Sequence, residues 1–343
     1  MDRIAANVKL DPRRLVVGLK AVAETTRLRI LMLLSANELN VKDLTQILGQ
    51  SQPRISRHLK LLVEAGLVER VREGSWVYFY ISDRNDAGRM AMRLIAEVDQ
   101  TDPVLRRDRE RADALRRERE TAAQAYFDGH AADWDRIRAL HVSESDVEAA
   151  IRSALGPGPF RLLIDLGTGT GRILELMADR YERGVGIDAS QAMLAYARTK
   201  LAGLGLAKAQ LRHGDLYNLA LPDGAADAVV MHQVLHYLSD PPGAIREAAR
   251  VLAPGGLLLI VDFAPHEMEF LRDAQAHERL GFATQQVEGW LTEAGLEPMP
   301  SHALPPPPGK GGTMLTVTIW QARQRSKPEG SGRRFERTLE EIR

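Results

Sequence analysis

The stretch from about residue 160 to 263 constrains the fold most, because strand-like runs alternate in it with segments of helical periodicity. The strand-like runs are RLLID, GVGID, AQLRHGD, ADAVVMHQ and GGLLLIVDF. Strands that alternate with helices at this spacing predict an α/β fold with a mainly parallel, doubly wound sheet. Ligands bind such sheets at the carboxyl ends of the strands, so a functional site is expected there.

Three glycines at alternate positions follow the first run, in LLIDLGTGTGR (162–172). Gly167, Gly169 and Gly171 allow a sharp turn and a close approach of the backbone to a ligand. A dinucleotide-binding loop has the spacing G-x-G-x-x-G and holds a pyrophosphate. Here the spacing differs, and the carboxylate of Asp165 would repel a pyrophosphate but attract the ammonium group of an amino acid. The loop therefore predicts a ligand in which a nucleoside is joined to an amino acid.

Acidic and polar residues stand at or just beyond the ends of the strand-like runs. Asp188 follows the glycine loop by about 20 residues, the distance at which an acid binds ribose hydroxyls. Asp215 could accept a hydrogen bond from an adenine amine, with the backbone of Leu216 at the ring edge. His232 closes a further run. An α/β fold that binds no nucleoside is the alternative.

Together these motifs resemble the class I S-adenosylmethionine-dependent methyltransferases, over residues 126–323. The resemblance implies a Rossmann-like domain with a mostly parallel seven-stranded sheet, closed by an antiparallel hairpin from PMPSHAL and GGTMLTVTIWQA. It implies S-adenosylmethionine or S-adenosylhomocysteine as the cofactor, and Tyr126 and Trp134 as covers for it or as packing residues. The cofactor-binding residues that follow are Asp165, Gly167, Thr168, Gly169, Gly171, Asp188, Ala189, Met193, Asp215, Leu216 and His232.

Methyl transfer to an oxygen or nitrogen usually needs a base that takes the proton of the acceptor. His232 and His236 follow the fourth strand and are the candidate catalytic bases, whereas His266 and His277 come later; any one of them could instead be structural. The first pair could also hold zinc, but the loop offers no clear third ligand, so no metal is expected. A carbon acceptor on a small aromatic ring is a further alternative, since the resemblance extends to quinone-biosynthesis methyltransferases. Arsenite methylation is rejected because the chain has no cysteine.

The first part of the chain follows a different pattern. Helical spacing over residues 12–35 is followed by short helices at 41–48 and from the cap residue Ser51 to about residue 65, and then by a hairpin around residues 73–74. Helix, tight turn, helix and hairpin in this order predict a winged helix-turn-helix of the α+β class. The second helix of that motif enters the major groove of DNA.

Polar and basic side chains that could meet bases or phosphates lie on the outer face of the second helix and on the hairpin. They are Gln52, Arg54, Ser56, Arg57 and Lys60 on the helix and Arg72 on the hairpin. Basic residues exceed acidic ones over residues 1–100, and the reverse holds over 126–323. An ordinary small helical domain with a solvated charged face is the alternative.

From about residue 12 to 82 the sequence resembles the ArsR/SmtB family of dimeric bacterial repressors, in ETTRLRILMLL and in the stretch from VKDLTQIL to WVYFYI. The resemblance implies double-stranded operator DNA and a second copy of the chain, in a homodimer, as partners. Many members sense metals or arsenic through a cysteine pair or through a histidine-and-carboxylate site on the last helix. Asn40 and Lys42 stand where those cysteines would fall, and residues 88–100 contain no histidine, so metal sensing is not expected.

These patterns divide the chain into a winged helix-turn-helix domain (1–98), a charged helical connector (99–125), a methyltransferase-like domain (126–323) and a flexible tail (324–343). Acids and arginines three or four residues apart favour a solvated connector helix, and its near-neutral charge disfavours the alternative of an RNA-binding tract. The sequence has no apolar run near the roughly 18 residues of a membrane span and no secretory signal. A cytoplasmic protein without a membrane partner is expected.

Two functions fit this organisation. The first is a transcriptional regulator whose C-terminal domain binds S-adenosylmethionine or S-adenosylhomocysteine as the effector that it senses. The second is an active small-molecule methyltransferase whose N-terminal domain regulates its own operon. A sensor and an enzyme need the same cofactor pocket, so the sequence does not separate the two, and it does not identify the methyl acceptor or the operator.

Overall fold

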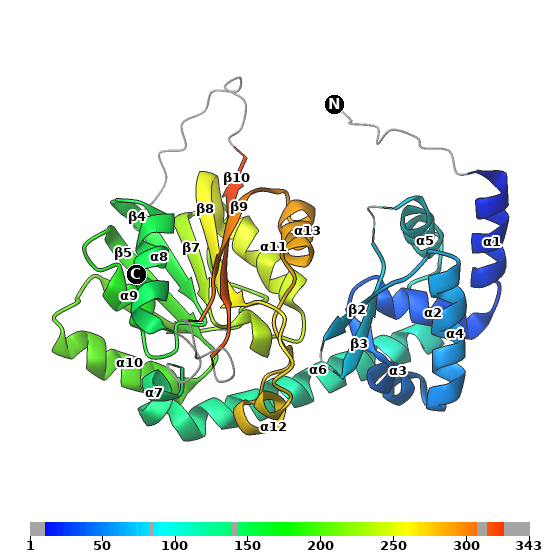
Figure 1. The fold of residues 1–343 in the computed structure, drawn as a ribbon, viewed down its shortest axis with the longest axis horizontal. Helices are drawn as coiled ribbons and strands as arrows, with labels where there is room; N and C mark the ends of the chain where they lie inside the picture. The colour runs from blue at the N-terminus through cyan, green and yellow to red at the C-terminus, as the bar shows by residue number, and fades with distance from the viewer. Residues whose placement is uncertain (1–10, 74, 83–84, 139–142, 307–313, 326–343) are drawn as a thin grey trace.

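The computed structural model describes residues 11–73, 75–82, 85–138, 143–306 and 314–325. Two domains are joined by one long helix, α6 (Pro103–His130), which runs along the lower edge of both domains in Figure 1. Residue 126, where the sequence places the start of the second domain, lies inside this helix. Of the tail predicted at 324–343, only the first two residues belong to the described part of the chain.

The N-terminal domain is the winged helix-turn-helix that the sequence predicts. Its helices are α1 (Pro12–Val22), α2 (Thr25–Leu34), α3 (Val41–Leu48), α4 (Gln52–Glu64) and α5 (Asp86–Ala96). Its short strands pair in the order β1-β3-β2 and are β1 (Leu39–Asn40), β2 (Glu69–Glu73) and β3 (Trp76–Tyr80). A capping box between Asn40 and Asp43 begins α3, and Gly49 in the left-handed conformation ends it, which makes the tight turn before α4.

Helix α4 turns an apolar face inward and a charged face to solvent. Ile55, Leu59 and Leu62 are buried, and Val63 is half-buried. Ser51 occupies the N-cap position, as expected, but its side chain makes no capping hydrogen bond. In Figure 1, α4 lies on the outer side of the domain, whereas the wing formed by β2 and β3 faces the C-terminal domain.

The C-terminal domain has the seven-stranded sheet that the methyltransferase resemblance implies, in the order β6-β5-β4-β7-β8-β10-β9. Neighbouring strands from β6 to β8 are parallel, and β10 is antiparallel to both β8 and β9, which is the expected closing hairpin. The strands are β4 (Phe160–Leu166), β5 (Tyr181–Asp188), β6 (Ala209–His213), β7 (Ala226–His232), β8 (Leu252–Phe263), β9 (Leu296–Leu304) and β10 (Val317–Gln324).

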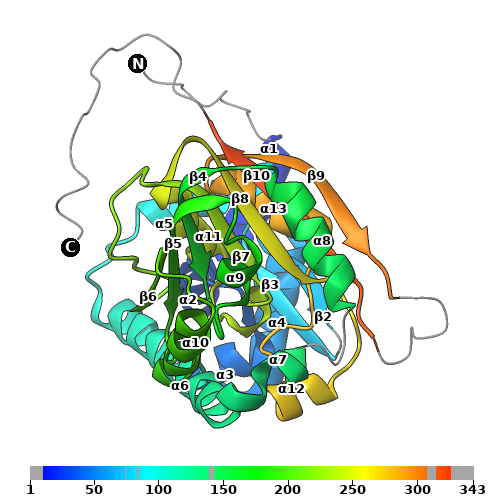
Figure 2. The same ribbon diagram turned by 90° about the vertical axis from the view of Figure 1, so that its left-hand side faces the viewer.

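Helices cover both faces of this sheet. The helical segments of this domain are η1 (Ala131–Asp133), α7 (Trp134–Arg138), α8 (Glu144–Leu155), α9 (Arg172–Leu176), α10 (Gln191–Gly203), η3 (Leu235–Tyr237), α11 (Pro241–Val251), α12 (Phe270–Gln275) and α13 (Thr284–Glu293). Both views show α6 passing beside α10 (Figures 1 and 2). Within the described ranges, no helix combines the length and the apolarity that a membrane span requires.

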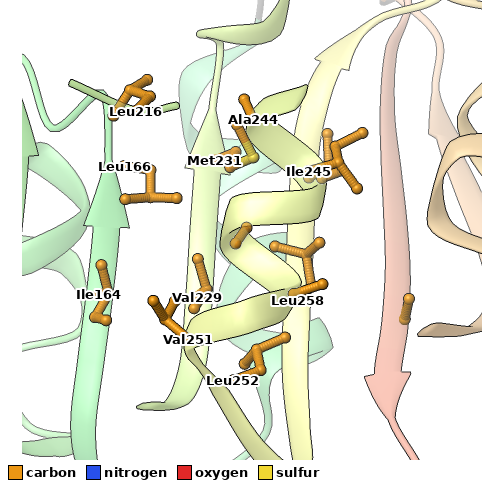
Figure 3. Close-up of a cluster of buried hydrophobic side chains, with 14 of the residues drawn as sticks. Ile164, Leu166, Leu216, Val229, Met231, Ala244, Ile245, Val251, Leu252 and Leu258 are labelled. Carbon is orange, nitrogen blue, oxygen red and sulfur yellow. The ribbon is translucent and has the colours of Figure 1, made fainter. Parts of the chain in front are cut away.

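Two apolar cores lie on opposite faces of the sheet, because successive side chains of a strand point to opposite sides. On one face, Ile245 of α11 packs near Met231 and Leu258 of the sheet (Figure 3). On the other face, Ile151 of α8 belongs to a cluster with Leu163. With both faces covered by helices, the strand ends remain the place where polar side chains can meet a ligand.

Candidate functional site

A cavity of about 470 Å³ lies at the carboxyl ends of the parallel strands. Its volume is in the range of small-molecule sites. The predicted cofactor residues that line it are Asp165, Gly167, Thr168, Gly169, Asp188, Ala189, Met193, Asp215, Leu216 and His232. Gly171 is not among the lining residues; it takes a left-handed conformation (φ +78°) at the start of α9 and packs against Leu201. The structure thus gathers nearly all of the predicted set around one space.

The glycine loop is held against β5 by its own backbone. The amides of Gly167 and Thr168 donate to the carbonyl oxygen of Ile187, at 2.8 and 3.0 Å. Gly167 has φ +70°, and a Cβ atom there would collide with the side chain of Val234, so no larger residue fits. The amide of Gly169 donates to Asp188 Oδ2 at 2.8 Å. The loop and the acid that follows it therefore form a single rigid cradle.

Asp188 ends β5 inside this cradle. Its carboxylate accepts from the amides of Gly169 and Ser190, each at 2.8 Å. Burial raises the pKa of Asp188, and the two amide hydrogen bonds oppose that rise only in part. Both hydroxyls of a ribose are donors, so a nucleoside would supply the further hydrogen bonds that a desolvated carboxylate requires. These features fit the sugar of a nucleoside ligand.

Asp165 lies almost fully buried at the end of β4, with 1% of its surface exposed. Its Oδ2 atom accepts a hydrogen bond from the hydroxyl of Thr168 at 2.6 Å. A buried carboxylate is stable only with charged or hydrogen-bonding partners. Its place beside the glycine loop fits the ammonium group that the sequence predicts there.

Aromatic side chains form another part of the cavity wall, and Trp134 lies beside Gly169 of the loop. Phe127 of α6 meets Trp134 edge-on at 5.3 Å and Tyr237 edge-on at 4.8 Å between ring centroids, and all three line the cavity. The predicted cover Tyr126 is not among the lining residues; it stacks on His130 at 4.3 Å instead. Phe127 and Tyr237, which the sequence analysis did not identify, therefore share the covering position with Trp134.

The two candidate bases occupy different environments. His232 ends β7 and lines the cavity. His236 lies in η3, 1% exposed and outside the lining, with its Nδ1 atom 2.7 Å from Oδ1 of Asp262. The ring of His277 lies beside it, tilted by 39° with the ring centroids 4.2 Å apart, and neither His277 nor His266 lines the cavity. No sequence pattern pairs His236 with Asp262, although IVDF does place an acid at the end of a buried strand.

The connector differs from the solvated helix that its composition predicts. One face of α6, the helix that contains it, forms a wall of the cavity, and the lining residues on that face are Arg117, Glu120, Thr121, Ala123, Gln124 and Phe127. Gln124 Nε2 donates to the carbonyl oxygen of Ala189 at 2.7 Å. These positions recur every three or four residues and so share one helical face. Most of that face is polar, which is why hydrophobic periodicity did not reveal it.

Other residues of α6 contact the N-terminal domain. Asp108 accepts two hydrogen bonds from Arg29 of α2, at 2.6 and 2.7 Å. Arg111 donates to the carbonyl oxygen of Ile47 in α3 at 3.0 Å, and Arg119 pairs with the buried carboxylate of Asp43. One helix therefore contacts both the cavity and the scaffold that holds α4.

A second contact joins the wing directly to the C-terminal domain. Arg279 is 1% exposed, and its Nε donates to the carboxylate of Glu73 at 2.8 and 3.0 Å. Its Nη2 donates to Glu38 at 2.8 Å. Burial opposes the positive charge, but the two glutamates hold the pKa of Arg279 well above its ordinary value. Tyr78 of β3 lies under the guanidinium, 4.2 Å from ring centroid to Cζ.

The predicted DNA-contacting residues are all solvent-exposed. They are Gln52, Arg54, Ser56, Arg57 and Lys60 on α4 and Arg72 on β2. In Figure 1 the helix that carries the first five lies on the side of the molecule away from the C-terminal domain. No group of three or more histidine, aspartate or glutamate side chains suited to a metal ion occurs in the portion of the chain that the structure describes.

Comparisons with known proteins agree with this division of the chain. Residues 24–70 match the family model described as bacterial regulatory protein, arsR family, and residues 164–260 match that described as methyltransferase domain. The arsenical resistance operon repressor of Escherichia coli is 46% identical over 80 residues, which cover 23% of this chain and 67% of the repressor.

Relatives of the second domain are described as methyltransferases. A probable S-adenosylmethionine-dependent methyltransferase of Mycolicibacterium smegmatis is 28% identical over 178 residues, 47% of this chain and 65% of that protein. The demethylmenaquinone methyltransferase of Thermus thermophilus is 39% identical over 118 residues, 34% of this chain and 53% of the enzyme. The chain spans less than two thirds of the length of these two methyltransferases.

Proposed function

We propose a function from the premise that this chain belongs to the ArsR family of bacterial regulatory proteins through its N-terminal domain and carries an S-adenosylmethionine-dependent methyltransferase domain behind it. The proposed protein is a transcriptional regulator that binds operator DNA. Its C-terminal domain binds S-adenosylmethionine or S-adenosylhomocysteine, and that nucleoside is the effector. Binding to chromosomal operators would place the protein in the cytoplasm.

The observation that carries this proposal is the double attachment of α6. Gln124 and Phe127 face the cavity, while Asp108 and Arg111 on the same helix bond to α2 and α3. An effector changes DNA affinity only if it binds two arrangements of the protein with different affinities. A ligand that contacts α6 can favour one of two such arrangements, because a shift of this continuous helix also changes its contacts with α2 and α3.

Operator binding is expected to require two copies of the chain. One recognition helix reads only a half-site, so a palindromic operator needs a pair. Helix α1 supports a self-association surface, since Leu15, Val16, Val17 and Leu19 remain 39 to 53% exposed. Contiguous exposed apolar side chains on a helix favour contact with another protein surface.

Titration of a fluorescent operator fragment with the full-length protein tests the effector role. Saturating S-adenosylmethionine and S-adenosylhomocysteine are added separately, and operator affinity is expected to change about fivefold or more with one of them. The variant Asp188→Ala, which removes the ribose acceptor, should bind the operator normally and lose that response. Operator affinity that stays unchanged at saturating levels of both nucleosides would refute the effector role.

An active small-molecule methyltransferase remains the second candidate, because His232 lines the cavity. Bound S-adenosylmethionine would supply an electrophilic methyl group. In this reading His232 takes the proton of an oxygen or nitrogen acceptor, and Phe127, Trp134 and Tyr237 exclude water. His236 contributes through its bond to Asp262 only if the cavity opens further, since it lies outside the lining.

The enzyme reading is tested by mass spectrometry of candidate acceptors incubated with the protein and the cofactor. Product formation should fall about 100-fold or more in His232→Ala, the usual contribution of a general base. Cofactor loss that is equally slow with and without acceptors would count against catalysis and leave the regulator.

A further inference from the structure

The connector helix directs a carboxylate into one end of the cavity. Glu120 is among the lining residues, and its Oε1 atom is buried without a hydrogen-bond partner. The cation that pairs with it, Nε of Arg116, is 3.8 Å from that oxygen, beyond hydrogen-bonding range. A buried acceptor left in this state costs free energy unless a donor reaches it. The Glu120 side chain is 38% exposed where it lines the cavity, so a bound ligand can donate a hydrogen bond to this carboxylate.

Asp215 stands at the same end of the cavity. It follows β6, lines the cavity, and one of its oxygens accepts from the amide of Tyr217 at 2.9 Å. Burial raises the pKa of Glu120, Arg116 opposes that rise, and the negative charge of Asp215 adds to it. Two carboxylates from separate elements thus converge on one region, where they repel each other until donors bind between them.

The exocyclic amine of adenine has two N–H donors, which matches two carboxylate acceptors. We infer that Glu120, together with Asp215, recognises this amine and is a specificity-determining residue supplied by the connector. This inference rests on the proposed nucleoside ligand. A 6-keto base such as hypoxanthine would place an oxygen atom against both carboxylates and be rejected.

Recognition by Glu120 would also join nucleoside binding to the N-terminal domain within a single turn of helix. Arg119, the preceding residue, pairs with Asp43 of α3, and its Nη1 atom lies 2.9 Å from Oε1 of Glu278. Asp43 is the residue that completes the capping box of α3. A nucleoside bound to Glu120 therefore restrains the segment of α6 that contacts α3, the helix before α4, through Arg119 and Asp43.

Calorimetry on the full-length protein tests the inference with S-adenosylhomocysteine and its hypoxanthine counterpart, S-inosylhomocysteine. Wild type is expected to prefer the adenine form by about 100-fold or more, because a site built to bind an N–H donor discriminates strongly against a ligand that lacks it. Glu120→Gln and Glu120→Ala should each reduce that preference about tenfold. Glu118→Gln, an exposed neighbour outside the cavity lining, should leave it unchanged.

The outcomes distinguish a wrong role for Glu120 from a wrong nucleoside ligand. If the Glu120 variants bind both ligands with wild-type affinities and preference, the role of Glu120 is refuted and the proposed nucleoside ligand stands. If wild type binds neither ligand, both the proposed effector and the role of Glu120 are refuted. Circular dichroism melting of each variant confirms that a lost preference does not come from unfolding.

Discussion

Replacing Glu73 by alanine should loosen the wing from the C-terminal domain, because it removes the main counter-charge of a buried guanidinium. Arg279 and Glu73 have side chains that are 1% and 3% exposed, so solvent hardly screens their interaction. Removing one partner of a buried ion pair typically costs about 3 to 5 kcal/mol, since the other charge stays buried and unpaired. Glu38 remains 2.8 Å from Arg279 as a second partner. We therefore expect the lower end of that range, about 3 kcal/mol.

That energy corresponds to more than a 100-fold shift in the equilibrium between docked and released wing. Hydrogen exchange measured by mass spectrometry detects release of the wing, because the amides of β2 and β3 should then exchange about 100-fold faster. Thermal unfolding should show a lower first transition. Glu64→Ala serves as the control, because its exposed pair with Lys60 at 3.8 Å contributes little.

The double variant Glu73→Ala with Arg279→Met completes a thermodynamic cycle. It removes the buried guanidinium that Glu73→Ala deprives of its main counter-charge, and Glu38 keeps hydrogen bonds from Trp290 Nε1 and Gln286 Nε2 at 3.3 and 3.4 Å, so it should recover part of the stability that the single change loses. Wild-type exchange and melting in Glu73→Ala would refute the reasoning, as would a double variant whose loss equals the sum of the two single losses.

Three other changes have defined outcomes. Asp188→Asn should abolish nucleoside binding in calorimetry. Burial raises the folded-state pKa of Asp188 above 3.8, so its ionisation costs stability at neutral pH. This variant should therefore melt at a higher temperature than wild type at pH 7 and lose that advantage as the pH falls toward 3.8. Nucleoside binding at wild-type strength would contradict the assigned role. Arg57→Ala should weaken operator binding and, if Arg57 contacts a phosphate, lower by about 1 the slope of log affinity against log salt concentration. An unchanged slope would show that Arg57 makes no phosphate contact. Val17→Asp, on an exposed apolar position of α1, should shift a dimer toward monomer in analytical ultracentrifugation, and an unchanged mass distribution would exclude α1 from the interface.

The predicted elements that the structure confirms depend on local properties of the chain. Apolar periodicity separates helix from strand, and glycine marks the positions where the backbone must take left-handed angles, as at Gly49 and Gly167. Parallel strands bring their carboxyl ends to one edge. Residues such as Asp188 and Asp215, which close successive strands or follow them, therefore meet there without further information.

Other features required the folded molecule. The polar face of α6 has the composition of a solvated helix, and only its packing beside α10 shows that Glu120 and Gln124 line the cavity. The pairing of His236 with Asp262 depends on how η3 meets the end of β8.

By itself, therefore, the sequence determined the two domain types and the chemistry of the strand ends, because both follow from short-range spacing. The tertiary structure alone decided how the domains contact each other. Glu73 and Arg279 are separated by 206 residues, and no local pattern distinguishes either from a solvated surface charge. Their pairing is a property of two surfaces that meet only after each domain has folded, and burial then makes the loss of one partner more costly than in the exposed pairs that the sequence suggests.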